Sequence, residues 1–143
     1  MEATIDRRTQ VRSLPRQRLG FALLTVSVAL IAAIIVPWGD LQDHSHWAKI
    51  GWIPFVSGPL RRRDILANVL LFMPLGAGAA LGFRGGVAAV AGLALTLSLT
   101  GETIQVYTHS RFPSATDVVC NVAGAVLGAL AVRRLLRRPV HER

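Results

Sequence analysis

The chain has 143 residues, of which 52% are hydrophobic, and its net charge is +8. Its polar residues lie in separate blocks, whereas a water-soluble domain would spread them over the sequence as a coat, and this argues against a soluble protein. A basic balance can indicate a nucleic-acid partner. Here the arginines flank apolar segments, so we expect anionic lipid beside them and no nucleic acid. A single cysteine, Cys120, excludes an intrachain disulfide.

Four apolar segments follow one another along the chain, and a bilayer core takes roughly 20 helical residues. The predicted spans are residues 19–37, 65–83, 86–107 and 117–132, with approximate ends. The first is longer than the apolar part of a signal peptide, so we interpret it as a retained helix. The sequence therefore predicts an all-α integral membrane protein. Four transmembrane helices form a small bundle over residues 19–132, between basic tails at 1–18 and 133–143.

The basic residues are distributed unevenly between the two sides of this predicted bundle. Most of them lie in the two tails and at Arg84, and the cytoplasmic side of a membrane protein carries the excess of arginine and lysine. Both termini are therefore predicted to be cytoplasmic, with loops 37–64 and 106–117 facing outward. The run Arg61-Arg62-Arg63 lies on the disfavoured outer side, and its role stays open.

Polar side chains lie at those span ends that this topology brings to one layer, near the outer surface. Offsets of three or four residues place them on one face of each helix. Because a polar face is costly in lipid, we expect these faces to turn inward and to form a shared pocket. Arg111 is the expected cation between the carboxylates. The candidate ligand-binding residues are Glu102, Gln105, Arg111, Asp117, Asn121, Asp64 and Asn68.

A weak internal repeat runs through two of these groups, since Asp64-Ile-Leu-Ala-Asn68-Val matches Asp117-Val-Val-Cys-Asn121-Val. Transporters often carry such repeats and bind their substrates where the repeats meet. Alternatively, each aspartate caps the start of a helix. Pairs of small residues four apart also predict close contacts between helices. These pairs are Gly124 and Gly128, Gly78 and Gly82, and Ala88 and Gly92.

Two stretches of the chain together resemble the signatures of VanZ-like membrane proteins. The first is Ile53-Pro54-Phe55 followed by Asp64-x-x-x-Asn68-Val-Leu-Leu-Phe-Met-Pro74-Leu-Gly76. The second contains Glu102-x-x-Gln105, Arg111, Ser114, Asp117-x-x-x-Asn121 and Gly124-x-x-x-Gly128. The resemblance covers about residues 52–132 and implies a multi-pass protein of the bacterial plasma membrane. The family is named for a protein linked to low-level teicoplanin resistance, which makes a link to envelope-active antibiotics an expectation.

The pocket is expected to bind a polar head group, from an envelope lipid or a glycopeptide-like ligand. Membrane lipids are the expected partners, and we predict no catalytic residue, no metal and no cofactor. Three alternatives stay open. The protein can be a membrane enzyme acting on a lipid-linked phosphate or glycan, with Glu102 and Asp117 as acid and base. It can be a small transporter, or a structural subunit whose polar groups only hold helices together. The sequence gives neither the ligand nor the oligomeric state.

Overall fold

Long helices make up most of the described chain. They are α1 (Arg7–Ile35), α2 (Arg62–Gly82), α3 (Val87–Gln105) and α4 (Ala115–Arg137), with a short 3-10 helix, η1 (Trp47–Lys49). The computed structural model describes residues 7–35, 47–57, 61–83, 85–107 and 112–137. Each of the four long helices is long and apolar enough to cross a membrane, and the described residues form no strand. The prediction of an all-α protein with four spans is confirmed.

Two helices extend beyond the predicted spans. The first begins at Arg7, within the predicted tail 1–18, and α4 continues to Arg137, within the predicted tail 133–143. Arginine has a high helix propensity, so a helix can continue from the apolar segment into the zone of the lipid head groups. The basic residues next to the spans are therefore held on helices and are not simply parts of unstructured tails.

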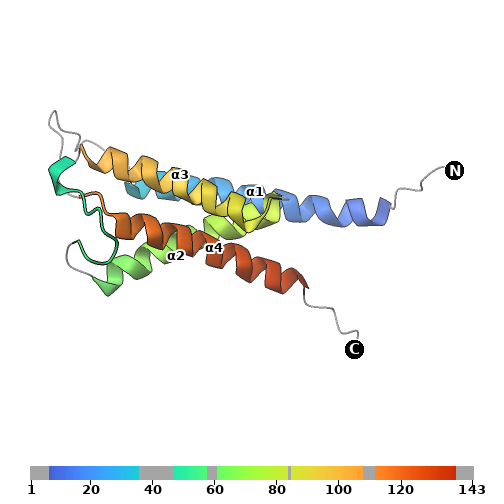
Figure 1. The fold of residues 1–143 in the computed structure, drawn as a ribbon. Coiled ribbons are helices and arrows are strands. Elements are labelled where there is room, and N and C mark those ends of the chain that lie inside the picture. The colour runs from blue at the N-terminus through green and yellow to red at the C-terminus, as the bar shows by residue number, and fades with distance from the viewer. Residues whose placement is uncertain (1–6, 36–46, 58–60, 84, 108–111, 138–143) are drawn as a thin grey trace.

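The helices alternate in direction, as Figure 1 shows. Helices α2 and α4 run parallel and pack against each other, while α1 packs on α2 and α3 packs on α4. As a result α1 and α3 end, and α2 and α4 begin, at the end of the bundle where η1 lies, which we call the η1 end. The opposite end holds the start of α1 and the finish of α4. Which end faces the cytoplasm stays a prediction.

Helices α2 and α4 approach so closely that glycine is required along their contact, which we call the α2–α4 seam. A Cβ atom on Gly124, Gly128 or Gly76 would overlap a backbone carbonyl of the facing helix. These carbonyls belong to Val69, Met73 and Ala125, respectively. Small residues at a membrane helix contact allow the backbones to approach and maximise their packing. The predicted Gly124 and Gly128 contact is confirmed.

The other two small-residue pairs differ from each other. Gly78 faces the backbone of α1 at Leu24, and Gly82 contacts α1 at Phe21, so this pair lies at a helix contact as predicted. Ala88 and Gly92 are exposed, and a Cβ atom on Gly92 would meet nothing within 4 Å. The predicted contact at Ala88 and Gly92 is therefore wrong. In a span rich in alanine and glycine, spacing alone does not say which face meets a neighbour.

The core lies between the helices, around the completely buried side chains of Phe72 and Leu75. Many large apolar side chains point outward instead, among them Leu19, Val26, Leu30, Leu66, Leu70, Leu95, Leu99, Leu127 and Leu135. A water-soluble monomer rarely exposes so extensive an apolar surface. Lipid chains are the natural cover for these faces of four membrane-length helices.

Candidate functional site

Residues 47–57, which we call the 47–57 segment, lie across the η1 end and are bonded to the start of α4. The Gly51 N–H donates to the Pro113 carbonyl and the Ala115 N–H donates to the Gly51 carbonyl, each at 2.9 Å. Phe55 has a positive φ of 61°, and its N–H donates to Thr116 Oγ1 at 2.9 Å. This conformation is unusual for a bulky residue, and the hydrogen bond to Thr116 stabilises it.

Ser114 joins α3, α4 and the 47–57 segment. Its N–H donates to Glu102 Oε2 at 2.7 Å, so a side chain from the end of α3 holds the backbone that precedes α4. Its hydroxyl accepts a hydrogen bond from the Thr116 N–H at 3.2 Å, which is the geometry of a helix N-cap. A parallel bridge also links Ser114 to Gly51.

The interpretation that Asp64 caps α2 and Asp117 caps α4 is wrong for both helices. Ser114 lies directly before α4 and caps it, while Asp117 lies inside the first turn. In α2 the residue at the cap position is Arg61, which makes no capping bond through its side chain, and Asp64 again lies in the first turn. Asp64 forms an ion pair with Arg63 at 3.4 Å on the surface. Both aspartates lie in the first turn of a helix, where a negative charge interacts favourably with the amino end of the helix dipole.

A cavity of about 140 Å³, which we call the inner pocket, lies between α1, α2, α3 and α4 at the η1 end. Its polar lining consists of side chains that the sequence predicted to converge: Asn68, Glu102, Gln105, Asp117 and Asn121. Ile34, Ile35, Ala67 and Leu71 supply the apolar lining. No basic side chain of the described residues lines it, so its polar chemistry comes from two carboxylates and three amides.

Asn121 has one satisfied and one unsatisfied polar atom. Its side chain is 3% exposed, and its Nδ2 donates to Ser98 Oγ at 2.9 Å. Its Oδ1 is buried and has no hydrogen-bond donor among the described residues. A buried polar atom without a partner costs about 1–3 kcal/mol. The inner pocket is large enough for a donor, since one water needs only about 10–15 Å³.

A larger cavity of about 650 Å³, which we call the outer cavity, adjoins the inner pocket. The two share Ala67, Asn68, Gln105 and Asp117 as walls. The outer cavity also has basic side chains in its lining, namely Lys49, Arg61 and Arg63. The outer cavity thus combines three cations with the Asp64 and Asp117 carboxylates, whereas the inner pocket has carboxylates and amides without a cation from the described residues.

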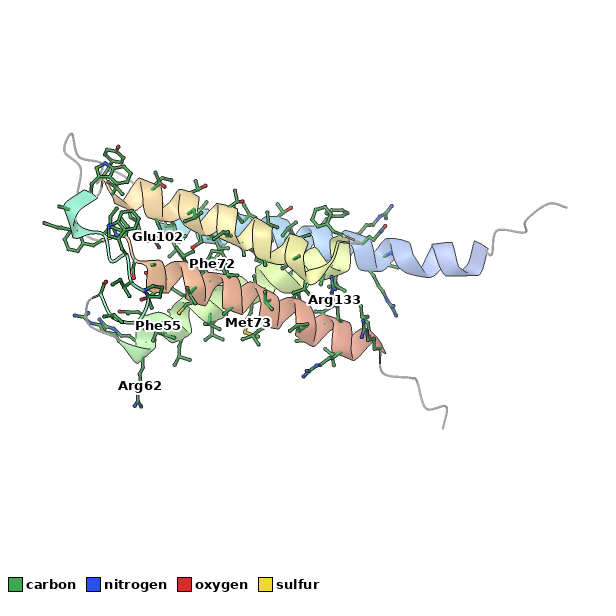
Figure 2. The ribbon with its side chains drawn as sticks, viewed as in Figure 1. Phe55, Arg62, Phe72, Met73, Glu102 and Arg133 are labelled. Atoms are coloured by element: carbon green, nitrogen blue, oxygen red, sulfur yellow. The ribbon has the colours of Figure 1, made fainter. Side chains whose placement is uncertain are left out.

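The arginine run divides between two faces of the start of α2. Arg61 and Arg63 line the outer cavity, whereas Arg62 does not, and its side chain points away from the bundle (Figure 2). Arg63 lies beside Asp64, so part of its charge is already neutralised. Lys49 lies over the ring of Phe112, with Nζ 4.8 Å from the ring centroid. The geometry thus separates two cavity-facing arginines from one that faces outward.

Six of the seven predicted site residues line the two cavities. Asp64 lines only the outer cavity, Glu102 and Asn121 only the inner pocket, and the other three line both. Arg111 lies outside the described residues, so its predicted role stays a prediction. Sequence reasoning did not predict the contribution of Ser98 or Thr116. The signal for Ser98 was its position four residues before Glu102, which places it on the same face of α3.

The described residues contain no group of three or more histidine, cysteine, aspartate or glutamate side chains placed to hold a metal ion. The inner pocket is lined instead by carboxylate and amide oxygens from single, separate side chains. The oxygens of the inner pocket can accept hydrogen bonds from a small hydroxyl or ammonium group.

Comparison with known families gives one match that covers most of the chain. A family model described as VanZ/LLP1 matches residues 13–137. This range contains all four apolar helices apart from the first turns of α1, and it contains every residue that lines the two cavities. No curated protein and no solved structure matches the chain.

Proposed function

This chain belongs to the VanZ/LLP1 family of multi-pass membrane proteins, and on that premise we propose that its two cavities bind the polar head group of an envelope component. The head group carries an anion, such as a phosphate, and a hydrogen-bond donor, such as an ammonium or hydroxyl group. The anion lies in the outer cavity and the donor in the inner pocket. A glycopeptide-like ligand has the same kinds of group.

The observation that carries this proposal is the unpartnered Asn121 Oδ1. A side chain that only joined helices would use both ends of its amide, because an unpaired buried oxygen destabilises the fold. Here Nδ2 joins α4 to α3, while Oδ1 has no donor among the described residues and Asn121 lines the inner pocket. An ammonium or hydroxyl group in the inner pocket supplies that donor, and the Glu102 and Asp117 carboxylates favour it further.

The lining of the outer cavity supports the proposal that the ligand carries an anion. Arg61 and Arg63 present guanidinium groups there, and guanidinium matches phosphate with two parallel hydrogen bonds. The same reasoning gives the arginine run a purpose on a side of the membrane where basic residues are disfavoured. One anionic and one donor group in a single head group fit the placement of the basic side chains, which line the outer cavity and not the inner pocket.

The test uses the full chain in phosphatidylcholine nanodiscs, whose head group has no N–H or O–H donor. The probe is glycerophosphoethanolamine, which has a phosphate and an ammonium group but no hydrocarbon chain. We expect it to raise the temperature of thermal unfolding in a saturable way. The double variant Arg61→Gln/Arg63→Gln should bind it about tenfold more weakly, a loss of about 1.4 kcal/mol.

Arg62→Gln is the matched control, because it removes the same charge from the same helix turn but faces away from the cavity. It should leave the affinity within about twofold, since exposed charges at a distance are screened by salt. An equal loss in both variants, or no response of the native protein to the probe, overturns the proposal. Recovery of the probe unchanged after incubation separates binding from the alternative of an enzyme.

The proposal places the protein in the bacterial plasma membrane with the η1 end facing outward. Labelling of a cysteine at position 57 or 112, in a Cys120→Ala background, by a membrane-impermeant thiol reagent tests this orientation. Both positions are exposed at the η1 end. If binding depletes or shields an envelope component, deletion of the gene should change susceptibility to envelope-active antibiotics, and unchanged susceptibility removes that link.

A further inference from the structure

A third cavity, which we call the flank groove, lies beside the two polar ones and has a different lining. Its volume is about 290 Å³. Its walls come from the 47–57 segment and from the facing parts of α3 and α4. Most of the lining side chains are apolar, among them Trp47, Trp52, Leu99, Val106, Val118 and Val119. Such a lining favours a hydrocarbon and offers little to a charged group.

The flank groove shares four lining residues with the polar cavities, among them Ile50 and Pro113, which also line the outer cavity. Glu102 lines both the flank groove and the inner pocket, and Ser114 lines both the flank groove and the outer cavity. These are the two residues joined by the 2.7 Å hydrogen bond from the Ser114 N–H to Glu102 Oε2. Glu102 and Ser114 thus lie between the groove and the polar cavities, so a ligand in the groove lies directly beside the polar site.

The groove also opens where lipid is expected. Leu99 and Val119 are 49% and 42% exposed and continue the apolar outer surfaces of α3 and α4. Trp47 and Trp52 are 51% and 69% exposed, and tryptophan is enriched at the level of the lipid head groups. The groove thus runs from the apolar surface of the bundle towards the interface, in the direction in which a lipid chain lies.

We propose that the flank groove holds the hydrocarbon chain of a phospholipid whose amine- or hydroxyl-bearing head group occupies the polar cavities. This inference rests on the proposed function and adds that the ligand is a membrane lipid, which enters sideways between the 47–57 segment and the α3–α4 pair. A chain anchored in the groove brings the head group beside Glu102 and Asn121. A water-soluble ligand would leave the groove unused.

The test uses quenching of tryptophan fluorescence by bromine atoms on lipid chains, with excitation of tryptophan alone. The full chain carries Trp38→Phe, so that emission comes from Trp47 and Trp52, and it is reconstituted in phosphatidylcholine nanodiscs. A small fraction of the lipid is replaced by phosphatidylethanolamine or phosphatidylcholine with identical brominated chains. We expect the ethanolamine lipid to quench at least about twofold more at equal mole fraction. Equal quenching by the two lipids overturns the inference.

A pair of variants on α4 locates the effect. Val119→Phe narrows the groove at an exposed position, and Leu127→Phe places the same ring at an exposed position of the same helix that lines none of the three cavities. The excess quenching should be lost in Val119→Phe and kept in Leu127→Phe. Loss in both, or in neither, contradicts a chain in the groove. The comparison of the two lipids in the native protein stands even if Val119→Phe folds poorly.

The chainless probe separates this inference from the function on which it rests. Glycerophosphoethanolamine should still stabilise Val119→Phe as it does the native protein. If the probe binds but the ethanolamine lipid gives no excess quenching, the proposed head-group site is kept and the inference of a lipid chain in the flank groove is rejected. If the probe does not bind, the proposed function itself fails. A disulfide between two copies through Val119→Cys, in a Cys120→Ala background, would make the groove a contact between proteins and would overturn the lipid inference.

Discussion

Helices α2 and α4 form the α2–α4 seam by themselves and line the inner pocket together with α1 and α3, and the two regions use the space beside these helices in opposite ways. Along the seam, glycines bring backbones together until no room for a Cβ atom remains. Within one turn of Val69 and Gly124 of the seam, Asn68 and Asn121 line a cavity whose other walls come from α1 and α3. The comparison teaches that the cavity is held open by its surroundings, because the glycine seam fixes the distance between two of the four helices that form it.

The largest expected effect comes from filling the seam. Gly128→Leu places a side chain against the Met73 carbonyl, whose backbone cannot move aside, and should lower the free energy of unfolding by more than about 2 kcal/mol. Gly92→Leu is the control, because a Cβ atom there meets open space. Unfolding in mixed detergent micelles with increasing denaturing detergent measures both. Equal destabilisation would mean that the seam is not the rigid part of the bundle.

A medium effect is expected where the 47–57 segment is bonded to α4. Thr116→Val removes the acceptor of the Phe55 N–H and should destabilise this attachment by about 1 kcal/mol. Amide hydrogen exchange should rise in residues 50–57 and stay low in α2. Thr100→Val is the control, since its exposed hydroxyl only donates back to the Thr96 carbonyl of its own helix. Unchanged exchange in Thr116→Val would show that other contacts hold the segment.

The smallest effect on stability, and the most informative, is expected at Asn121. Asn121→Leu loses the bond to Ser98, worth about 0.6 kcal/mol on average in a membrane, but also removes an unpaired oxygen. Its unfolding free energy should change by less than about 1 kcal/mol, while stabilisation by glycerophosphoethanolamine should disappear. Ser98→Ala should show the converse, with reduced stability and retained binding. Binding by Asn121→Leu at native affinity would contradict the role given to Oδ1.

The sequence predicted the four helices well because a membrane span needs about 20 consecutive, mostly apolar residues, and such a run can be recognised without knowing the packing. It also predicted that Asn68, Glu102 and Asn121 converge, because alternating helix directions bring those ends together whatever the details of packing. That inference needed only the number of crossings and the position of each polar residue within its span.

The sequence did not predict the features that depend on which helix faces contact each other. Gly92 and Gly128 lie in the same kind of small-residue pair, yet one faces open space and the other a carbonyl. The capping of α4 by Ser114 was missed because an aspartate three residues later is an equally good capping residue by type. The 47–57 segment carries no regular pattern, and its bridge from Gly51 to Ser114 is a pairing between residues far apart in the chain.

The parallel course of α2 and α4 has a consequence for the entrance to the outer cavity. The backbone dipoles of a helix add up to roughly half a positive charge at its amino end. Because both helices begin at the η1 end, two such ends flank the same opening, beside Arg61 and near Ser114. The two amino ends add partial positive charge to the entrance, but the Asp64 and Asp117 carboxylates in the same first turns offset it, so the pull on anions depends on the basic side chains.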